Sequence, residues 1–119
     1  MLCLWFTTAA FAPPLSMDDV LDAIKKGDAM RVSKFFDNTV QINLPDKNAS
    51  YSKSQAFLII RDFFANNKIK GLNILYKSSN LNSHYCFGSL LTVNGSFKMS
   101  LFMRQDGSND VIQELHFEK

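Results

Sequence analysis

From residue 69 to its end, the sequence contains four segments with the pattern of β-strands and no helical pattern. The turn sequences SSNLNS, VNG and QDGSN separate these segments, which lie near 69–77, 83–92, 96–104 and 110–118. Strands that follow one another through short turns pair in antiparallel fashion. The helical patterns all come earlier, so the order of elements predicts an α+β fold in which N-terminal helices pack on one face of a strongly curved antiparallel sheet.

Local signals place the helices. Ser16, followed by Asp19, predicts the start of a first helix, and Gly27 predicts its end. Asp28 is expected to cap a second, short helix. Three residues are predicted to form the buried side of that helix: Met30, Phe35 and Phe36.

A strand and a third helix follow. The alternation in TVQINL, residues 39–44, is typical of a strand, and SYS is expected to form a short edge piece after it. The capping box from Ser52 to Gln55 then predicts a helix that turns its phenylalanine side towards the core.

The first twelve residues, MLCLWFTTAAFA, contain no charged side chain and end in the A-x-A pattern of a signal-peptide cleavage site. We expect residues 1–12 to be a signal peptide, residues 17–119 to be a single domain, and the protein to be exported to the periplasm or secreted. An apolar arm packed on the domain is the alternative. The segment is far shorter than the ~20 apolar residues of a membrane span, so no stable span is expected.

Composition excludes several kinds of function. A net charge of +2 is too small for a nucleic-acid-binding face. Cys86 would have no partner after the loss of Cys3, which excludes an internal disulfide and a cysteine metal site. The two histidines, His84 and His116, lie far apart, and no metal-binding or phosphate-cradling motif is present. We therefore expect no metal and no cofactor.

The register of the last three strands decides which residues share a face. Their bulky residues stand mostly at odd positions, and a slip of one residue would turn a whole strand over. With a three-residue loop at 93–95, Thr92 would pair with Ser96. Odd-numbered residues of one strand would then lie opposite odd-numbered residues of the next, and Gly95 would take the left-handed conformation. This is the register that we predict.

That register divides the candidate residues between two faces. The helix-facing side would carry the residues expected to line a pocket for a small apolar ligand: Tyr51, Tyr76, Tyr85, Met99, Met103 and Gln113. A packed core with a locally bonded amide is the alternative for Gln113, Met99 and Met103. The outer side would carry an apolar strip that forms a partner surface or a homodimer interface: Cys86, Phe102 and Ile112, with His84 and Arg104 at its rim. A loop or the N-terminal arm covering the strip is the alternative.

The stretch SHYCFG places a histidine, a tyrosine and a cysteine side by side. In a strand, His84 and Cys86 point to one face and Tyr85 to the other. The three therefore cannot act together, and we expect no catalytic residue among them.

The order of elements, together with the GD between the first helices, YSKSQAF…DFF and LLTVNGSF, resembles the nuclear transport factor 2-like superfamily. Within it, these stretches are similar to a branch of exported bacterial proteins described as a domain of unknown function. The resemblance covers residues 17–119 and implies a cone-shaped α+β fold. Its relatives include ketosteroid isomerases and polyketide cyclases as well as many ligand and partner binders.

The resemblance also implies where an enzyme of this kind would keep its acid or base, namely Asp or His inside the cone. The predicted register places neither on the inner face, so we expect a non-enzymatic domain that binds a small apolar ligand or a protein partner. The enzyme alternative would need a bulge that turns His84 inward, or Asp106 or Asp110 reaching over the mouth of the cone.

Overall fold

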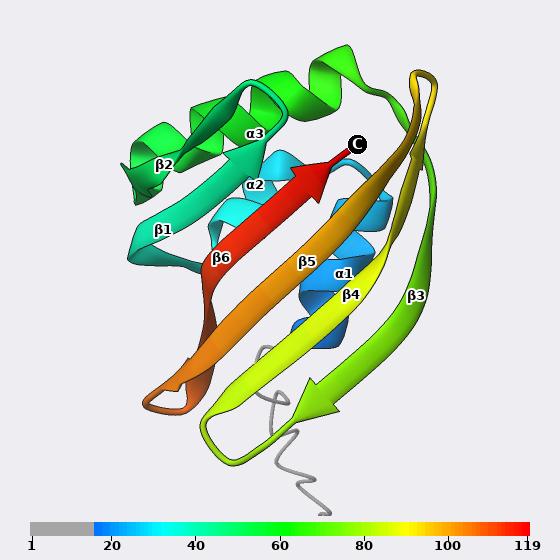
Figure 1. Ribbon diagram of the computed structural model, residues 1–119. Coiled ribbons are helices and arrows are strands. Elements are labelled where there is room, and N and C mark those ends of the chain that lie inside the picture. Colours follow the sequence, from blue (N-terminus) through cyan, green and yellow to red (C-terminus); the bar gives the residue numbers. More distant parts are fainter. Residues whose placement is uncertain (1–15) are drawn as a thin grey trace, which may run out of the picture.

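A computed structural model describes residues 16–119 (Figure 1). The helices and strands follow in the order α1 (Met17–Lys25), α2 (Ala29–Ser33), β1 (Phe36–Leu44), β2 (Lys47–Ser52), α3 (Lys53–Asn66), β3 (Ile69–Ser79), β4 (Ser83–Thr92), β5 (Gly95–Asp106) and β6 (Asn109–Glu118). The signal peptide predicted for residues 1–12 lies outside the described residues, so it stays a prediction. No helix among residues 16–119 has the length and apolar character needed to cross a membrane.

The six strands form one curved sheet in the order β2-β1-β6-β5-β4-β3. Figure 1 looks at the face that the helices leave open, with α1 and α2 behind the sheet. The predicted α+β class is confirmed. The prediction of a wholly antiparallel sheet is corrected at one place, because β1 pairs with β6 in parallel. These two strands are distant in the sequence, so no hairpin dictates their direction.

The capping signals are confirmed by hydrogen bonds. The Ser52 hydroxyl accepts the N–H of Gln55 at 3.3 Å, and the Asp28 carboxylate accepts that of Arg31 at 3.1 Å. Gly27 has the predicted left-handed backbone, with φ of 66°. The predicted buried side of α2 is wrong for Met30, which is 56% exposed, because this helix is a single short turn with one covered side. Phe35 and Phe36 are buried as predicted, but they lie after α2, and Phe36 begins β1.

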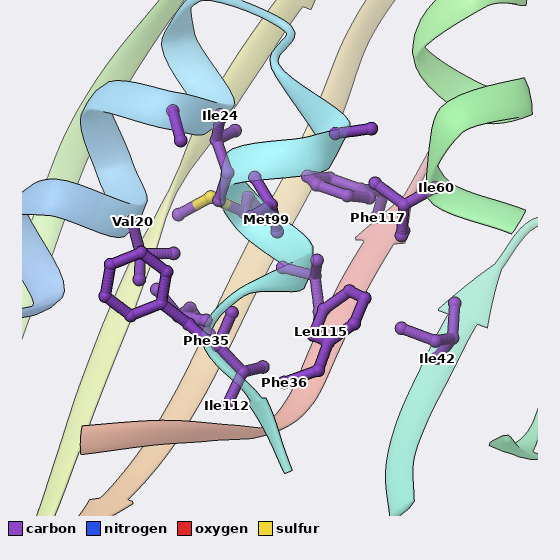
Figure 2. Packing of buried hydrophobic residues seen from close by; sticks show 14 of the residues in the cluster. Val20, Ile24, Phe35, Phe36, Ile42, Ile60, Met99, Ile112, Leu115 and Phe117 are labelled. Atoms are coloured by element: carbon purple, nitrogen blue, oxygen red, sulfur yellow. The ribbon is translucent and has the colours of Figure 1, made fainter. Parts of the chain in front are cut away.

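The core lies between the helices and the inner face of the sheet (Figure 2). Phe117 of β6 stacks on Phe63 of α3, with ring centroids 4.9 Å apart and planes 9° apart. Phe97 meets the edge of Phe63 at 5.1 Å. The rings therefore hold α3 against β5 and β6.

The predicted register between β4 and β5 is wrong. Thr92 pairs with Gly95, and even positions of β4 lie opposite odd positions of β5. Gly95 does take the expected left-handed conformation, with φ of 105°. As a result β5 keeps its predicted faces, whereas β4 is turned over.

The β6 strand changes face part-way along its length. A bulge shifts the pairing between Phe102 and Met103, so Phe102 lies opposite Glu114 and Met103 opposite Ile112. Gln113 is the extra residue and is exposed. The bulge sends Ile112 into the core, where it is 0% exposed.

Candidate functional site

The structure does not bring the six predicted ligand-lining residues together. Met99 and Met103 are buried in the core, where they fill space. Tyr51, on the edge strand β2, is partly buried against the core. Tyr76 and Tyr85 lie on the outer face, and Gln113 is exposed at the bulge. The inner placement predicted for Tyr76, Tyr85 and Gln113 is wrong, because β4 is turned over and because β3 and β6 are bulged.

The outer face carries an aromatic strip formed by Tyr76, Tyr85 and Phe102. The Tyr85 and Phe102 ring centroids are 4.6 Å apart, and those of Tyr76 and Tyr85 are 6.2 Å apart. Tyr76 is 57% exposed and Phe102 is 37% exposed. An apolar strip was predicted here, but its members differ: Cys86 and Ile112 are buried on the opposite side, and two tyrosines take their place.

Next to the aromatic strip, polar side chains form a hydrogen-bonded network across β2, β1 and β6. Asn43 lies 3.0 Å from Nδ1 of His116, and its Oδ1 accepts Nε2 of Gln41 at 2.7 Å. The Gln41 Oε1 accepts the Ser50 hydroxyl at 2.9 Å. The outer face is therefore aromatic over β3–β5 and amide-rich over β1 and β2.

Arg104, predicted at the rim of the partner surface, is tied to β1. Its Nη2 donates to Oδ2 of Asp37 at 2.9 Å and its Nε donates to the same oxygen at 3.3 Å. Burial acts to raise the pKa of Asp37, but the hydrogen bonds from Arg104 and from the Asn38 N–H outweigh it, so the pKa lies below its ordinary value. The pair thus keeps a partly buried carboxylate in its charged form.

His84 lies on the inner side of the sheet and not on the outer rim where it was predicted. Its Nδ1 is 2.8 Å from the Ser79 hydroxyl, and its Nε2 is 3.4 Å from Oδ2 of Asp110. We call these three residues the His84 cluster. The predicted register placed neither Asp nor His on the inner face, and this is wrong for His84 because β4 is turned over.

Ser79 and Asp110 each reach the cluster through strand pairing. Ser79 is the direct cross-strand partner of His84 across the β3–β4 turn. Asp110 comes from β6, two residues before the inward-facing Ile112. Sequence reasoning did not select Ser79; the spacing of Ser79 and His84 around a hairpin turn was the signal that could have found it.

Cys86 lies on the inner side of β4 and is 0% exposed. Burial raises the pKa of its thiol, which disfavours the reactive thiolate. In a Cys3→Ser chain, we expect Cys86 to react with a thiol reagent such as dithionitrobenzoate at least about 1,000-fold more slowly than the same chain unfolded in urea. Equal rates in the two states would show that the thiol is accessible and that β4 is not turned as described.

The larger cavities are open hollows at the edges of the fold. The cavity between α3, the β1–β2 turn and β5, of about 430 Å³, has Phe63, Phe97 and Lys119 in its lining. Among residues 16–119, no three side chains of the usual metal-binding types come together. The described part of the chain thus offers two features of functional interest, the outer face and the His84 cluster.

Comparison with protein families supports the likeness drawn from the sequence. A family model described as "Domain of unknown function (DUF4783)" matches residues 17–118. The chain belongs to the DUF4783 family. A DUF4783 protein from Bacteroides uniformis is similar in structure, with a TM-score of 0.83 and 25% identity over 87% of this chain and 95% of that one. No curated protein matches the chain.

More distant structures share the fold of this DUF4783 member. A putative calcium/calmodulin-dependent protein kinase type II association domain from Thiobacillus denitrificans has a TM-score of 0.68 and 9% identity, over 88% of this chain and 94% of that one. A protein named "Rd1NTF2_04 with long sheet" has a TM-score of 0.65 and 18% identity, over 84% of this chain and 94% of that one. The DUF4783 domain is therefore a nuclear transport factor 2-like fold, as the resemblance implied.

Proposed function

We propose that this domain is a binding module that forms a homodimer through the outer face of its sheet. The observation that carries the proposal is the exposed aromatic strip on the side of the sheet opposite the helices. Contiguous aromatic surface of this kind is typical of protein interfaces, whose centres are enriched in tyrosine and phenylalanine. Phe87, paired with Tyr76, adds a further half-buried ring to it.

A second copy of the chain suits this face because the face carries both signs of charge. Lys98 of β5 lies opposite Glu118 of β6, and Glu114 of β6 lies opposite Phe102. In a two-fold dimer each surface meets itself, so a self-complementary surface needs acidic and basic groups together. The name of the Thiobacillus structure, an association domain, gives the same fold a role in assembly in that protein.

The geometry favours a protein partner over a small apolar ligand inside the cone. The helix-facing side of the sheet is filled by side chains that are almost fully buried, Met99 and Met103 among them. A ligand there would have to displace packed side chains, at a cost comparable to a core substitution. The outer face needs no such rearrangement.

The substitution Phe102→Glu tests the proposal. It places two carboxylates at the centre of a two-fold interface, and we expect the dimer dissociation constant to rise at least about 100-fold. Sedimentation velocity over a range of protein concentrations measures the change. The matched control is Leu81→Glu, because Leu81 is a large apolar residue that is 89% exposed in the β3–β4 turn. A wild-type chain that stays monomeric at every concentration, or equal effects of the two substitutions, would overturn the proposal.

A further inference from the structure

A small cavity of about 240 Å³ lies between the start of α1 and one end of the inner sheet face. Four structural elements line it: α1 with its cap (Ser16, Met17 and Asp18), β3 (Lys77 and Ser79), β4 (His84) and β6 (Asp110). The cavity contains the whole His84 cluster and lies on the side of the sheet away from the aromatic strip. The proposed dimer interface makes no use of it.

We propose that Ser79 is a nucleophile that His84 activates as a general base, with Asp110 as a positioning residue, and that this site hydrolyses small carboxylic esters. The distance of 2.8 Å between the Ser79 hydroxyl and His84 Nδ1 is within hydrogen-bond reach for proton transfer. The Asp110 carboxylate lies 3.4 Å from the other ring nitrogen, where it favours this orientation of the ring once His84 has taken up the proton. Covalent catalysis generally uses a nucleophile, a base next to it, and a third group that orients the base. This arrangement is recognised by its geometry and not by the order of the three residues in the sequence.

Exposure of the three side chains suits these roles. The Ser79 residue is exposed and open to a substrate. The side chains of His84 and Asp110 are only 24% and 18% exposed, so their interaction is partly shielded from water. Ser79 and His84 are held opposite each other by backbone pairing of β3 and β4, which places the nucleophile and its base on rigid elements.

The reaction proceeds in two steps, formation of an acyl-serine and its hydrolysis. The Ser79 oxygen forms a bond with the ester carbonyl carbon while its proton passes to Nδ1 of His84. The bond between that carbon and the leaving oxygen then breaks, and the departing alcohol takes the proton from His84. Water repeats the sequence on the acyl-serine, which releases the carboxylic acid and restores the serine hydroxyl.

Two groups in the lining are placed to stabilise the negative oxygen that develops on the substrate. The Lys77 ammonium lines the cavity and is 2.7 Å from Oδ1 of Asp18. The first turn of α1 also lines it. The N–H of Asp19 already donates to the Ser16 carbonyl oxygen at 3.1 Å, so the N–H groups of Met17 and Asp18 are the ones without a carbonyl partner in the helix. The cavity volume limits the acyl group to a short one.

The test uses 4-nitrophenyl acetate as substrate and diisopropyl fluorophosphate as a covalent probe. The probe is attacked at phosphorus by Ser79 with loss of fluoride, and peptide mass spectrometry locates the adduct. We expect Ser79→Ala to abolish labelling and His84→Gln to lower the labelling rate at least about 100-fold. For Asp110→Asn we expect kcat for the acetate to fall about 10-fold or more at unchanged KM.

The matched control is Ser78→Ala, because Ser78 neighbours Ser79 on the chain but pairs with the outward-facing Tyr85. This variant should label and turn over like the wild-type chain. Circular dichroism checks that each variant is folded, and the three separate substitutions keep the test informative if one is not. Absence of an adduct on Ser79 in the folded wild-type chain would overturn the proposal, and so would labelling that is unaffected by His84→Gln.

Discussion

Replacement of Phe117 by alanine is expected to lower the free energy of unfolding by about 3–5 kcal/mol, the usual range for a buried phenylalanine. Phe117 is 0% exposed, stacks on Phe63, and meets Phe64 edge-on with centroids 6.0 Å apart. These aromatic contacts add to the loss of buried area and to the cavity that remains. Since domains of this size are stable by only about 5–15 kcal/mol, the variant should be close to unfolding at physiological temperature.

Urea denaturation followed by circular dichroism measures the effect, with an unchanged slope as evidence that both chains unfold in the same way. The control is Leu81→Ala, which removes the same kind of apolar surface from a residue that is 89% exposed. We expect its effect to lie within about 0.5 kcal/mol of zero. Similar losses for the two variants would contradict the assignment of Phe117 to the core.

Replacement of Gly88 by alanine is expected to cost about 2–3 kcal/mol, because β4 and β3 approach too closely there for a methyl group. A Cβ at Gly88 would lie 2.5 Å from the carbonyl oxygen of Asn73. That oxygen belongs to the backbone and cannot rotate away, so the strand β3 itself must shift. Gly88 pairs with Ile74, and the register of the two strands changes directly after that pair, at the bulge between Ile74 and Tyr76.

Gly71→Ala is the matched control, since Gly71 is the glycine of the partner strand β3 and pairs with Leu91 of β4. A Cβ there would meet only Leu91 Cδ1, at 3.7 Å, an ordinary contact. Loss of glycine's flexibility in the unfolded chain should make this variant equal to the wild type in stability or more stable by up to about 1 kcal/mol. Equal destabilisation by the two alanines, measured as thermal midpoints, would mean that the close approach at Gly88 is absent.

The elements and their ends could be predicted because their causes are local. The hydroxyl of Ser52 and the carboxylate of Asp28 act on N–H groups three residues away, and a glycine such as Gly27 ends a helix by its own backbone freedom. The order of helices before strands then limited the possible folds to a small set. The comparison with solved structures supports that choice of fold.

The faces of the strands could not be predicted in the same way, because β4 is apolar on both sides. One side of β4 carries the larger residues, Tyr85, Phe87 and Leu91, yet the side with Cys86 and Leu90 is the one in the core. Alternation gives the period of a strand, but it does not say which side faces the helices when large rings stand outside. The bulge at Gln113 depends on how β5 and β6 fit together, which no single segment encodes.

The His84 cluster was missed for a related reason. Sequence reasoning named His84 and Asp110 only as separate enzyme alternatives and did not select Ser79, because the partners of His84 come from distant segments, β3 and β6. The prediction that Tyr85 lies on the other face from His84 and Cys86 agrees with the observed pairing. The two faces of β4 are exchanged relative to the predicted ones, and His84 therefore lies on the inner side of the sheet, near Asp110.

The parallel contact between β1 and β6 has a consequence for synthesis on the ribosome. Asn43 and His116 meet across it although they are 73 residues apart. Until β6 has left the exit tunnel, β1 has an unpaired edge, and the pair β1–β2 is not connected to the strands β3–β5. The growing chain therefore cannot complete the sheet before β6 emerges. During that interval the unpaired edge of β1 is a site where two nascent chains could pair, and chaperone protection of that edge should matter most until β6 emerges.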